Sequence, residues 1–280
     1  MIDLHLHLLP EIDDGSSSVQ MSRAMLESLA RQGVTRVVAT PHLMQPLTDD
    51  YHHLALSLLD QIRPLAATHG VSVDLGYEHL LAPGLAARLH AGEPSNMAGG
   101  SAVLVELPFV GWPWHADSSL FALRVAGFTP ILAHPERYLE VQKQPELALV
   151  AGEQGTVLQL TSGSFAGVYG KAVERSARHL LAAAIERDIP VVLASDAHSD
   201  GHRLSSVPEG LQWIRRKVED GDLVVEWANG VVPSKLLQSE PVPPFQRWAQ
   251  TAARPGGSDR RSRPPLWKKA LGLAGRSGRG

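Results

Sequence analysis

The chain has 280 residues, of which 44% are hydrophobic and 20% charged, and its formal net charge is -3. These values are typical of soluble globular proteins, and the length suits one large domain or two smaller ones. The chain has no cysteine, which excludes disulfide frameworks, thiolate zinc sites and every enzyme whose nucleophile is a cysteine.

Short apolar runs alternate along the chain with longer segments in which Leu and Ala recur at helical spacing. The predicted strands are Met1–Leu6, Arg36–Thr40, Val71–Leu75, Ala102–Leu107, Thr129–Ala133, Thr156–Leu160 and Pro190–Ala194. The predicted helices between them include Val19–Gln32, Tyr51–His69, Ala116–Gly127 and Ala172–Arg187. This alternation predicts an α/β fold with parallel strands, and a closed or distorted barrel fits seven repeats better than an open sheet.

The last forty residues differ in composition from the rest. From Pro241 onward there are nine basic residues and one acidic residue, and the segment is rich in Pro, Gly and Arg. Such a composition buries little apolar surface. We therefore predict a folded domain over 1–240 and a basic tail over 241–280 that is disordered or loosely docked. Within the tail, 264–273 mixes apolar and cationic side chains, and we expect a solvated terminus there. The alternative is weak contact with an anionic partner, either a membrane surface or an acidic protein.

No apolar run approaches the roughly 18–20 residues of a membrane span. The first residues also lack the basic-then-apolar order of a secretion signal. We therefore expect a cytoplasmic protein. No aromatic and basic motif indicates nucleic-acid binding.

Polar side chains lie at or near the carboxyl ends of six of the seven predicted strands. His5 and His7 are two residues apart and share one face of the first strand, and Asp14 lies in the loop that follows. The later strands bring His42, Glu78, Glu106, His134, Asp196 and His198. Barrel enzymes assemble their active sites at this end of the strands, so we expect these nine side chains to converge.

The residue types indicate the chemistry of the predicted site. Imidazole and carboxylate ligands suit Mn, Fe or Zn, and five histidines with four carboxylates are enough for two or three ions. Closely spaced divalent ions activate water and stabilise a phosphoryl transition state, so the sequence predicts metal-assisted phosphoester hydrolysis. Arg137 and Arg203 follow His134 and His198 closely, which predicts a phosphate clamp; surface ion pairs are the alternative.

The other eight histidines fall in helical or loop contexts and are predicted to be surface residues. Two of them, His79 and His202, neighbour proposed site residues. The full set is His52, His53, His69, His79, His90, His115, His179 and His202.

The order of the motifs resembles a known superfamily. The motifs are His5-Leu6-His7, Ile12-Asp13-Asp14-Gly15, Thr40-Pro41-His42, Val105-Glu106-Leu107-Pro108-Phe109, His134-Pro135-Glu136-Arg137-Tyr138, Gly167-Val168-Tyr169-Gly170-Lys171 and Ser195-Asp196-Ala197-His198. Together they span about residues 1–203 and resemble the polymerase and histidinol phosphatase superfamily. The likeness is greatest to its branch of bacterial manganese-dependent tyrosine-protein phosphatases, which are encoded with capsule and exopolysaccharide genes.

The resemblance implies a distorted, TIM-like (β/α)7 barrel with three manganese ions, Fe or Zn being the alternatives. It assigns His5, His7, Glu78 and Asp196 to one ion, Glu78, Glu106 and His134 to a second, and Asp14, His42 and His198 to the third. It also assigns Arg137 and Arg203 to phosphate binding. The implied substrate is phosphotyrosine on a protein, namely a bacterial tyrosine kinase that governs polysaccharide export.

Two other functions fit the same residues. One is hydrolysis of a small phosphomonoester such as histidinol phosphate, and the other is a metal-stabilised binding module without catalytic activity. The chain also departs from the family pattern at Leu6, Leu43 and Leu80, which we expect to alter the wall of the pocket.

Overall fold

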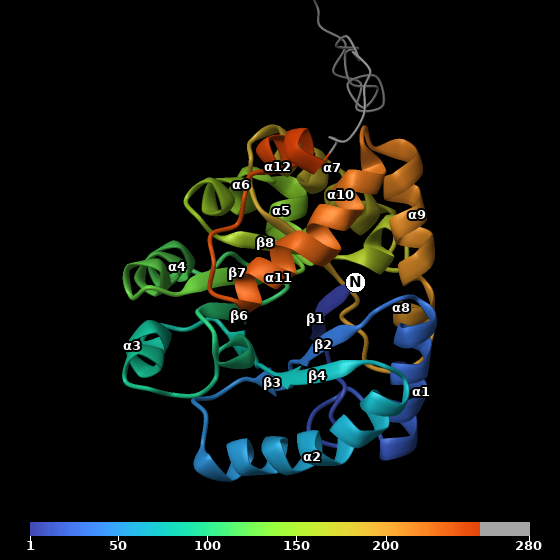
Figure 1. Cartoon of the computed structure of the whole chain (residues 1–280). Coiled ribbons are helices and arrows are strands. Elements are labelled where there is room, and N and C mark those ends of the chain that lie inside the picture. The colour runs from blue at the N-terminus through green and yellow to red at the C-terminus, as the bar shows by residue number, and fades with distance from the viewer. Residues whose placement is uncertain (253–280) are drawn as a thin grey trace, which may run out of the picture.

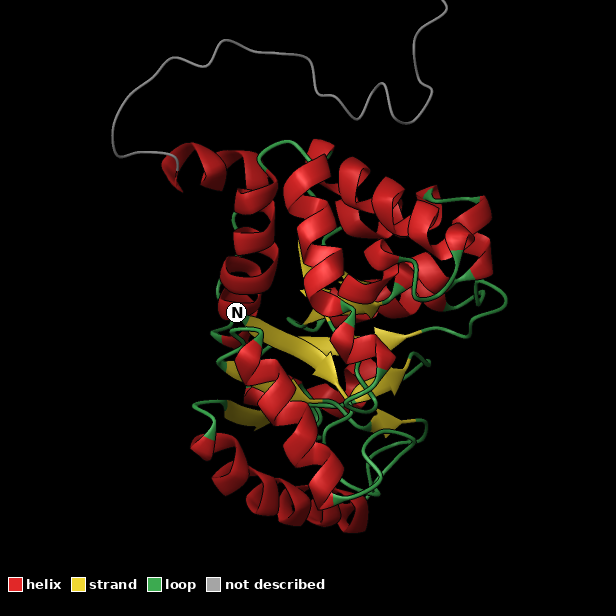
Figure 2. Cartoon of the chain, turned by 90° about the vertical axis from the view of Figure 1, so that its right-hand side faces the viewer, coloured by secondary structure: helices red, strands yellow, loops and turns green. Residues whose placement is uncertain are grey.

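The computed structural model describes residues 1–252, in which parallel strands run through the middle of the molecule with helices on both sides (Figure 1; Figure 2). One sheet has the strand order β1-β2-β4 and the other the order β3-β5-β6-β7-β8-β9. The strands are β1 (Ile2–Leu6), β2 (Arg36–Ala39), β3 (His42–Leu43), β4 (Ser72–Leu75), β5 (Glu78–Leu80), β6 (Ala102–Glu106), β7 (Thr129–Ala133), β8 (Val157–Thr161) and β9 (Val191–Ala194).

Two of the predicted strands continue after a break of two residues. Residues 40–41 separate β2 from β3, and residues 76–77 separate β4 from β5. Hydrogen bonds cross both breaks, because Gly76 N donates to Ala39 O at 2.9 Å and Glu78 N donates to Pro41 O at 3.1 Å. The seven predicted runs therefore become nine strands without a change of direction.

The two sheets also meet at β1 and β9. Asp196 N donates to His5 O, and His7 N donates to Ala197 O, both at 2.8 Å. A parallel bridge between Leu6 and Ala197 accompanies these bonds. The predicted parallel α/β architecture is confirmed, whereas the strand ladders of residues 1–252 form two sheets rather than one closed barrel.

The four predicted helices are present, with ends that differ by one or two residues. Ser18 caps α1 by accepting a hydrogen bond from Met21 N, and Thr48 caps α2 by accepting one from Tyr51 N. The Thr48 cap explains why α2 begins two residues before the predicted Tyr51. These helices are α1 (Val19–Arg31), α2 (Asp49–Thr68), α4 (Ala116–Val125) and α7 (Lys171–Glu186).

The sequence reading did not specify the remaining helices, most of which are short. The α-helices are α3 (Leu85–His90), α5 (Leu139–Lys143), α6 (Glu146–Glu153), α8 (His202–Ser205), α9 (Val207–Lys217), α10 (Gly221–Glu226), α11 (Val232–Leu237) and α12 (Phe245–Ala252). The single-turn and irregular ones are η1 (Met97–Gly99), η2 (Pro135–Arg137), η3 (Ser162–Ala166) and η4 (Trp227–Val231). None of the helices in residues 1–252 has an apolar stretch long enough to cross a bilayer.

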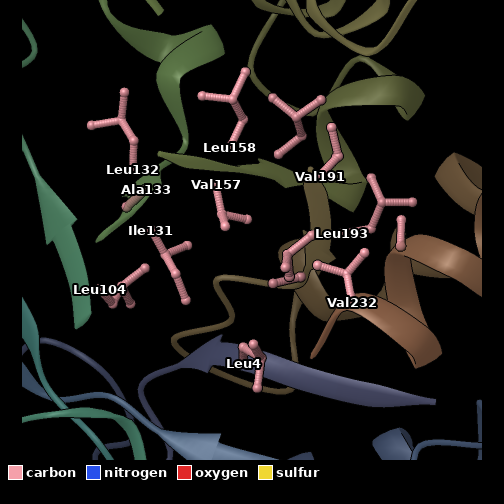
Figure 3. Close-up of a cluster of buried hydrophobic side chains, with 14 of the residues drawn as sticks. Leu4, Leu104, Ile131, Leu132, Ala133, Val157, Leu158, Val191, Leu193 and Val232 are labelled. Carbon is pink, nitrogen blue, oxygen red and sulfur yellow. The ribbon is translucent and has the colours of Figure 1, made fainter. Parts of the chain in front are cut away.

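Buried aliphatic side chains from both sheets hold the strands together. Figure 3 shows Leu4 of β1 and Val232 of α11 gathered with side chains from β6 to β9. A second cluster packs β1 and β2 against α1 and α2, and it includes Leu6, Met25 and Leu59. This packing fixes the strand ends relative to one another, which is what positions the site.

Part of the predicted tail packs against the body. Trp227 Nε1 donates to Pro243 O at 3.0 Å, and the Phe245 ring meets the Trp227 ring edge-on with centroids 5.5 Å apart. Phe245 is buried and α12 follows it. Residues 241–252 therefore dock on the body, because the Phe245 and Trp227 side chains bury each other there. The rest of the predicted tail, 253–280, lies outside the described residues.

Candidate metal centre

The nine side chains predicted from the strand ends come together around the buried carboxylate of Glu78. Glu78 Oε2 lies 3.0 Å from His5 Nε2, 3.3 Å from His7 Nε2 and 3.2 Å from His42 Nδ1. Glu78 Oε1 lies 3.0 Å from His134 Nε2. One carboxylate therefore contacts four imidazoles.

The cluster continues toward the surface through three further residues around His42. Asp14 Oδ1 lies 3.3 Å from His42 Nε2 and 3.4 Å from His198 Nε2, and its side chain is 71% exposed. Glu106 Oε1 lies 3.5 Å from His42 Nδ1 and is buried. The site is therefore buried at Glu78 and open to solvent at Asp14, where a substrate could enter.

Three groups of side chains in the cluster have donor atoms that all lie within 4.8 Å of one another. The groups are His5, His7, Glu78 and Asp196; His7, Asp14, His42 and His198; and His42, Glu78 and Glu106. The first group is the set assigned above to one ion. The other two differ from the assigned sets, because His7 joins the group at the mouth and His42 stands where His134 was expected.

The spacing of the donor atoms fits divalent cations. Two atoms that each lie about 2.1 Å from one ion are about 3.0 to 3.4 Å apart at octahedral or tetrahedral angles. The contacts from Glu78 Oε2 to the imidazoles fall in this range, yet Glu78 Oε2, His5 Nε2 and His7 Nε2 have no hydrogen-bond partner among the described residues. Buried polar atoms are normally paired, so these atoms fit ligands that face a shared ion.

The tautomers of His5 and His7 also fit metal binding. Gln159 Oε1 accepts hydrogen bonds from the His134 main-chain N at 3.0 Å and from His5 Nδ1 at 2.9 Å. Since the main-chain N–H can only donate, the amide atom is an oxygen and His5 Nδ1 carries its proton. His5 Nε2 is therefore free to offer a lone pair to a cation.

Asp13 fixes the tautomer of His7 in the same way that Gln159 fixes the tautomer of His5. Its Oδ2 accepts from His7 Nδ1 at 2.7 Å and from the His42 main-chain N at 3.0 Å, while its Oδ1 accepts from Gly15 N at 2.9 Å. Burial opposes ionisation of Asp13, but its bonds to His7 and the main chain hold its pKa below the usual value. A side chain on Gly15 would meet His7 Cβ at 2.3 Å, so only glycine lets this loop approach so closely.

Two site residues have left-handed backbone conformations at the ends of strands. His134 has φ +34° directly after β7, and Asp196 has φ +48° two residues after β9. Such conformations cost about 1–3 kcal/mol in non-glycine residues and cluster at functional sites. This backbone conformation turns both side chains into the cluster, and the hydrogen bond that His134 N donates to Gln159 Oε1 helps to hold it at His134.

Charges in the cluster are strongly coupled. Burial alone would raise the pKa of Glu78, but the surrounding imidazoles, His5 above all, hold it well below its usual range. Burial alone would lower the pKa values of His5 and His7, yet nearby carboxylates raise both above the ordinary imidazole value. At the mouth, burial and the adjacent His7 lower the pKa of His198 to about 4. Each interior imidazole and carboxylate thus favours the charged form of the other.

The two predicted clamp arginines converge on Asp196. Arg137 Nη2 and Arg203 Nη1 both donate to Asp196 Oδ2, while Asp196 Oδ1 lies 3.3 Å from His5 Nε2. Arg137 also donates to Thr161 Oγ1 at 2.8 Å. Burial disfavours the charge on Asp196, but Arg137 and the imidazoles hold its pKa well below the usual value. The guanidinium groups therefore lie at the edge of the candidate metal centre.

The loop after β6 brings one exposed aromatic ring to the border of the site. The Phe109 ring stacks on the His134 ring with centroids 5.6 Å apart, yet Phe109 remains 48% exposed. Leu139 N donates to Phe109 O, which ties the loop to α5. Val110 and Trp114 on the same loop are 70% and 90% exposed.

Other sequence predictions are corrected by the structure. His79 is buried rather than on the surface, and it pairs with Ser95 O through Nε2 at 2.9 Å. Leu6 and Leu43 belong to the hydrophobic cluster beneath α1 and α2, so they form core rather than pocket wall. Asp13 and Gln159 were not predicted from the sequence. The sequence signals for them are the acidic pair in the Asp13-Asp14-Gly15 loop and the amide in the middle of the mostly apolar strand β8.

The fold and the site define the class of this protein: a parallel α/β protein whose clustered histidine and carboxylate side chains could hold metal ions. A family model described as "Capsular polysaccharide synthesis, CpsB/CapC" matches residues 1–228. The chain belongs to this family.

Individual relatives support the same assignment. Tyrosine-protein phosphatase YwqE of Bacillus subtilis is 28% identical over 257 residues, which cover 88% of this chain and 97% of that protein. Tyrosine-protein phosphatase CpsB of Streptococcus pneumoniae is 25% identical over 224 residues, covering 78% and 90% of the two chains. A solved structure from work on YwqE and CpsB, described as metal-dependent tyrosine phosphatases, matches with a TM-score of 0.75 and 28% identity over 86% of this chain and 96% of that one.

Proposed function

We propose that this protein is a metal-dependent phosphatase that hydrolyses phosphotyrosine on a protein substrate. The observation that carries the proposal is the cluster of five imidazoles and four carboxylates, in which buried donor atoms face one another at ligand spacing. The relatives named as tyrosine-protein phosphatases are matched over most of their own length, which supports the same activity here.

Divalent cations in such a centre would supply the charge that activates water and stabilises the phosphoryl transition state. The ligands we propose are His5, His7, Asp14, His42, Glu78, Glu106, His134, Asp196 and His198. They suit manganese, with Fe or Zn as alternatives, and their number fits three ions. The β-strands that carry these ligands would together form one distorted (β/α)7 barrel.

The protein's own residues would bind and orient the substrate. The guanidinium groups of Arg137 and Arg203 can donate to phosphate oxygens, and Arg203, whose side chain is 36% exposed, is the more accessible. The exposed Phe109 ring at the border of the site offers an apolar surface to an aryl group. This pairing of cations and an aromatic ring favours phosphotyrosine over a small polar phosphomonoester.

We infer a biological setting from the family. The substrate would be a bacterial tyrosine kinase of capsule or exopolysaccharide synthesis, and the protein would act in the cytoplasm. The domain proposed to carry the activity is 1–240. A contact of residues beyond 252 with an anionic membrane remains a separate proposal.

Substrate comparison tests the activity directly. We expect the manganese-loaded protein to show a higher kcat/KM for a phosphotyrosyl peptide than for histidinol phosphate, and to lose activity on chelation and regain it on readdition of metal. A preference of several orders of magnitude for histidinol phosphate would contradict the proposal. So would full activity after chelation.

Ligand substitutions test the role of the cluster. We expect His5→Ala and Asp196→Ala to lower metal content, measured by elemental analysis, and to reduce kcat at least about 100-fold. His53→Ala, at an exposed position of α2, serves as the control with normal metal content. If the protein is instead a metal-stabilised binding module without catalytic activity, these variants should lose metal but keep their binding to the partner kinase and their biological effect.

A further inference from the structure

The ring of Tyr169 lies against both arginines at the edge of the site. The guanidinium carbon of Arg137 lies 4.1 Å from the ring centroid, and that of Arg203 lies 5.6 Å from it. Tyr169 sits between η3 and α7 in a turn where Gly167 and Gly170 have φ values of +79° and +87°. The turn thus aims one aromatic side chain at two cations from other parts of the chain.

Two neighbouring guanidinium groups repel each other unless negative charge lies between them. The only carboxylate oxygen that both reach among the described residues is Asp196 Oδ2. The other oxygen of this carboxylate faces His5 inside the candidate metal centre. A π face attracts cations and provides a second source of negative potential that no metal ligand has to share.

The hydroxyl group of Tyr169 takes no part in this arrangement. The Tyr169 hydroxyl oxygen is buried and has no hydrogen-bond partner among residues 1–252. The ring is therefore the part of the side chain that contacts the arginines, and phenylalanine would offer the same face.

We propose that Tyr169 is a positioning residue that holds Arg137 and Arg203 side by side as a receptor for a phosphate dianion. This inference rests on the proposed function of the same site. It adds a residue whose role is to set the geometry of the clamp rather than to touch the reacting atoms.

Inorganic phosphate is the probe that tests the clamp apart from catalysis. On the manganese-loaded full chain we expect Tyr169→Leu to weaken phosphate binding about tenfold, measured by calorimetry, and Tyr169→Phe to stay within about twofold of the wild type. Metal content should be equal in all three proteins. Tyr169→Met replaces the leucine variant if that variant does not fold.

A double-mutant cycle tests whether Tyr169 acts through an arginine. Once Arg203→Lys has removed the planar guanidinium group, we expect Tyr169→Leu to weaken phosphate binding by less than about threefold. Purely additive effects would overturn the proposal. The proposal would also be overturned by any of three results. These are normal phosphate affinity in Tyr169→Leu, equal losses of affinity in the Phe and Leu variants, and no phosphate binding by the wild type.

Kinetics separate this inference from the proposed function. With a phosphotyrosyl peptide we expect Tyr169→Leu to raise KM more than it lowers kcat, and Tyr169→Phe to restore KM. If the wild type binds phosphate in a Tyr169-dependent manner but hydrolyses no phosphotyrosyl peptide, the proposed function fails and the clamp stands.

Discussion

At the scale of single residues, the buried amide of Gln159 controls two members of the site. It fixes the tautomer of His5 and pairs the main-chain N of His134, whose backbone is strained. Partners of this kind are worth about 10–100-fold in metal affinity. Gln159 is thus as much a part of the candidate metal centre as the proposed ligands.

We predict that Gln159→Leu weakens manganese binding about 10–100-fold, because His5 loses the acceptor that fixes its proton. Competition with a chelator of known affinity measures the effect. Gln154→Leu, at an exposed position, is the matched control and should bind manganese normally. Unchanged affinity in the Gln159 variant would show that the tautomer of His5 is set elsewhere.

Protons should compete with cations for the same imidazoles. The carboxylates around His5 and His7 raise both pKa values in the metal-free protein, so these rings are protonated to higher pH than ordinary histidines. Metal ligation requires neutral imidazoles, and binding must therefore release protons. The affinity for manganese is expected to increase as the pH rises through the raised pKa values of His5 and His7, and to fall as the pH decreases below them.

Calorimetry in two buffers with different ionisation enthalpies tests this prediction. We expect manganese binding to release at least one proton near pH 7, and the apparent affinity to increase between about pH 6 and pH 8. The same heat in both buffers would contradict the raised pKa values.

At the scale of secondary-structure elements, the loop from β6 to α4 combines a ligand with an aromatic surface. Glu106 ends β6 inside the cluster, and Phe109 follows three residues later with its ring on His134. A hydrogen bond from Gly111 N to Glu140 Oε2 at 2.8 Å and one to Phe109 O from α5 hold this loop. The loop is therefore placed to distinguish substrates by their leaving groups.

We predict that Phe109→Ala lowers kcat/KM for a phosphotyrosyl peptide about tenfold, because the aryl group loses a stacking partner. Hydrolysis of a small alkyl phosphate should change less than about twofold. Phe121→Ala, which removes a 60% exposed ring from α4, is the control. An equal loss for aryl and alkyl substrates would mean that Phe109 supports His134 instead of contacting substrate.

At the scale of the whole molecule, the boundary of the folded body lies beyond Pro241. Phe245 is 3% exposed and packs on Trp227, the largest fully buried side chain among residues 1–252. Burying an aromatic side chain of this kind stabilises a fold by about 2–3 kcal/mol. Residues 241–252 should therefore contribute to stability, although composition assigned them to the tail that begins at Pro241.

Two truncations locate this boundary. Removal of 253–280 is expected to leave Tm within about 2 °C of the full chain, and removal of 241–280 to lower it by about 5 °C or more. Thermal unfolding followed by circular dichroism measures both. Equal Tm values for the two truncated proteins would place the boundary at Pro241, as composition alone suggested.

The sequence by itself determined the strands, the main helices and the residues that meet at the site. Apolar runs mark buried parallel strands, and parallel strands direct their carboxyl ends to the same edge. A polar residue after such a run, such as His134 after β7, is therefore predictable from local pattern alone. The nine predicted site residues converge for this reason.

Only the tertiary structure decided which side chains support that site. Gln159 and His5 are 154 positions apart in the chain, and Tyr169 reaches arginines on two different short helices, η2 and α8. Composition also could not reveal that Phe245 packs on Trp227. Periodicity reports only whether a residue faces the core, whereas hydrogen bonds, stacking and strain depend on which segments pack together and at what distance.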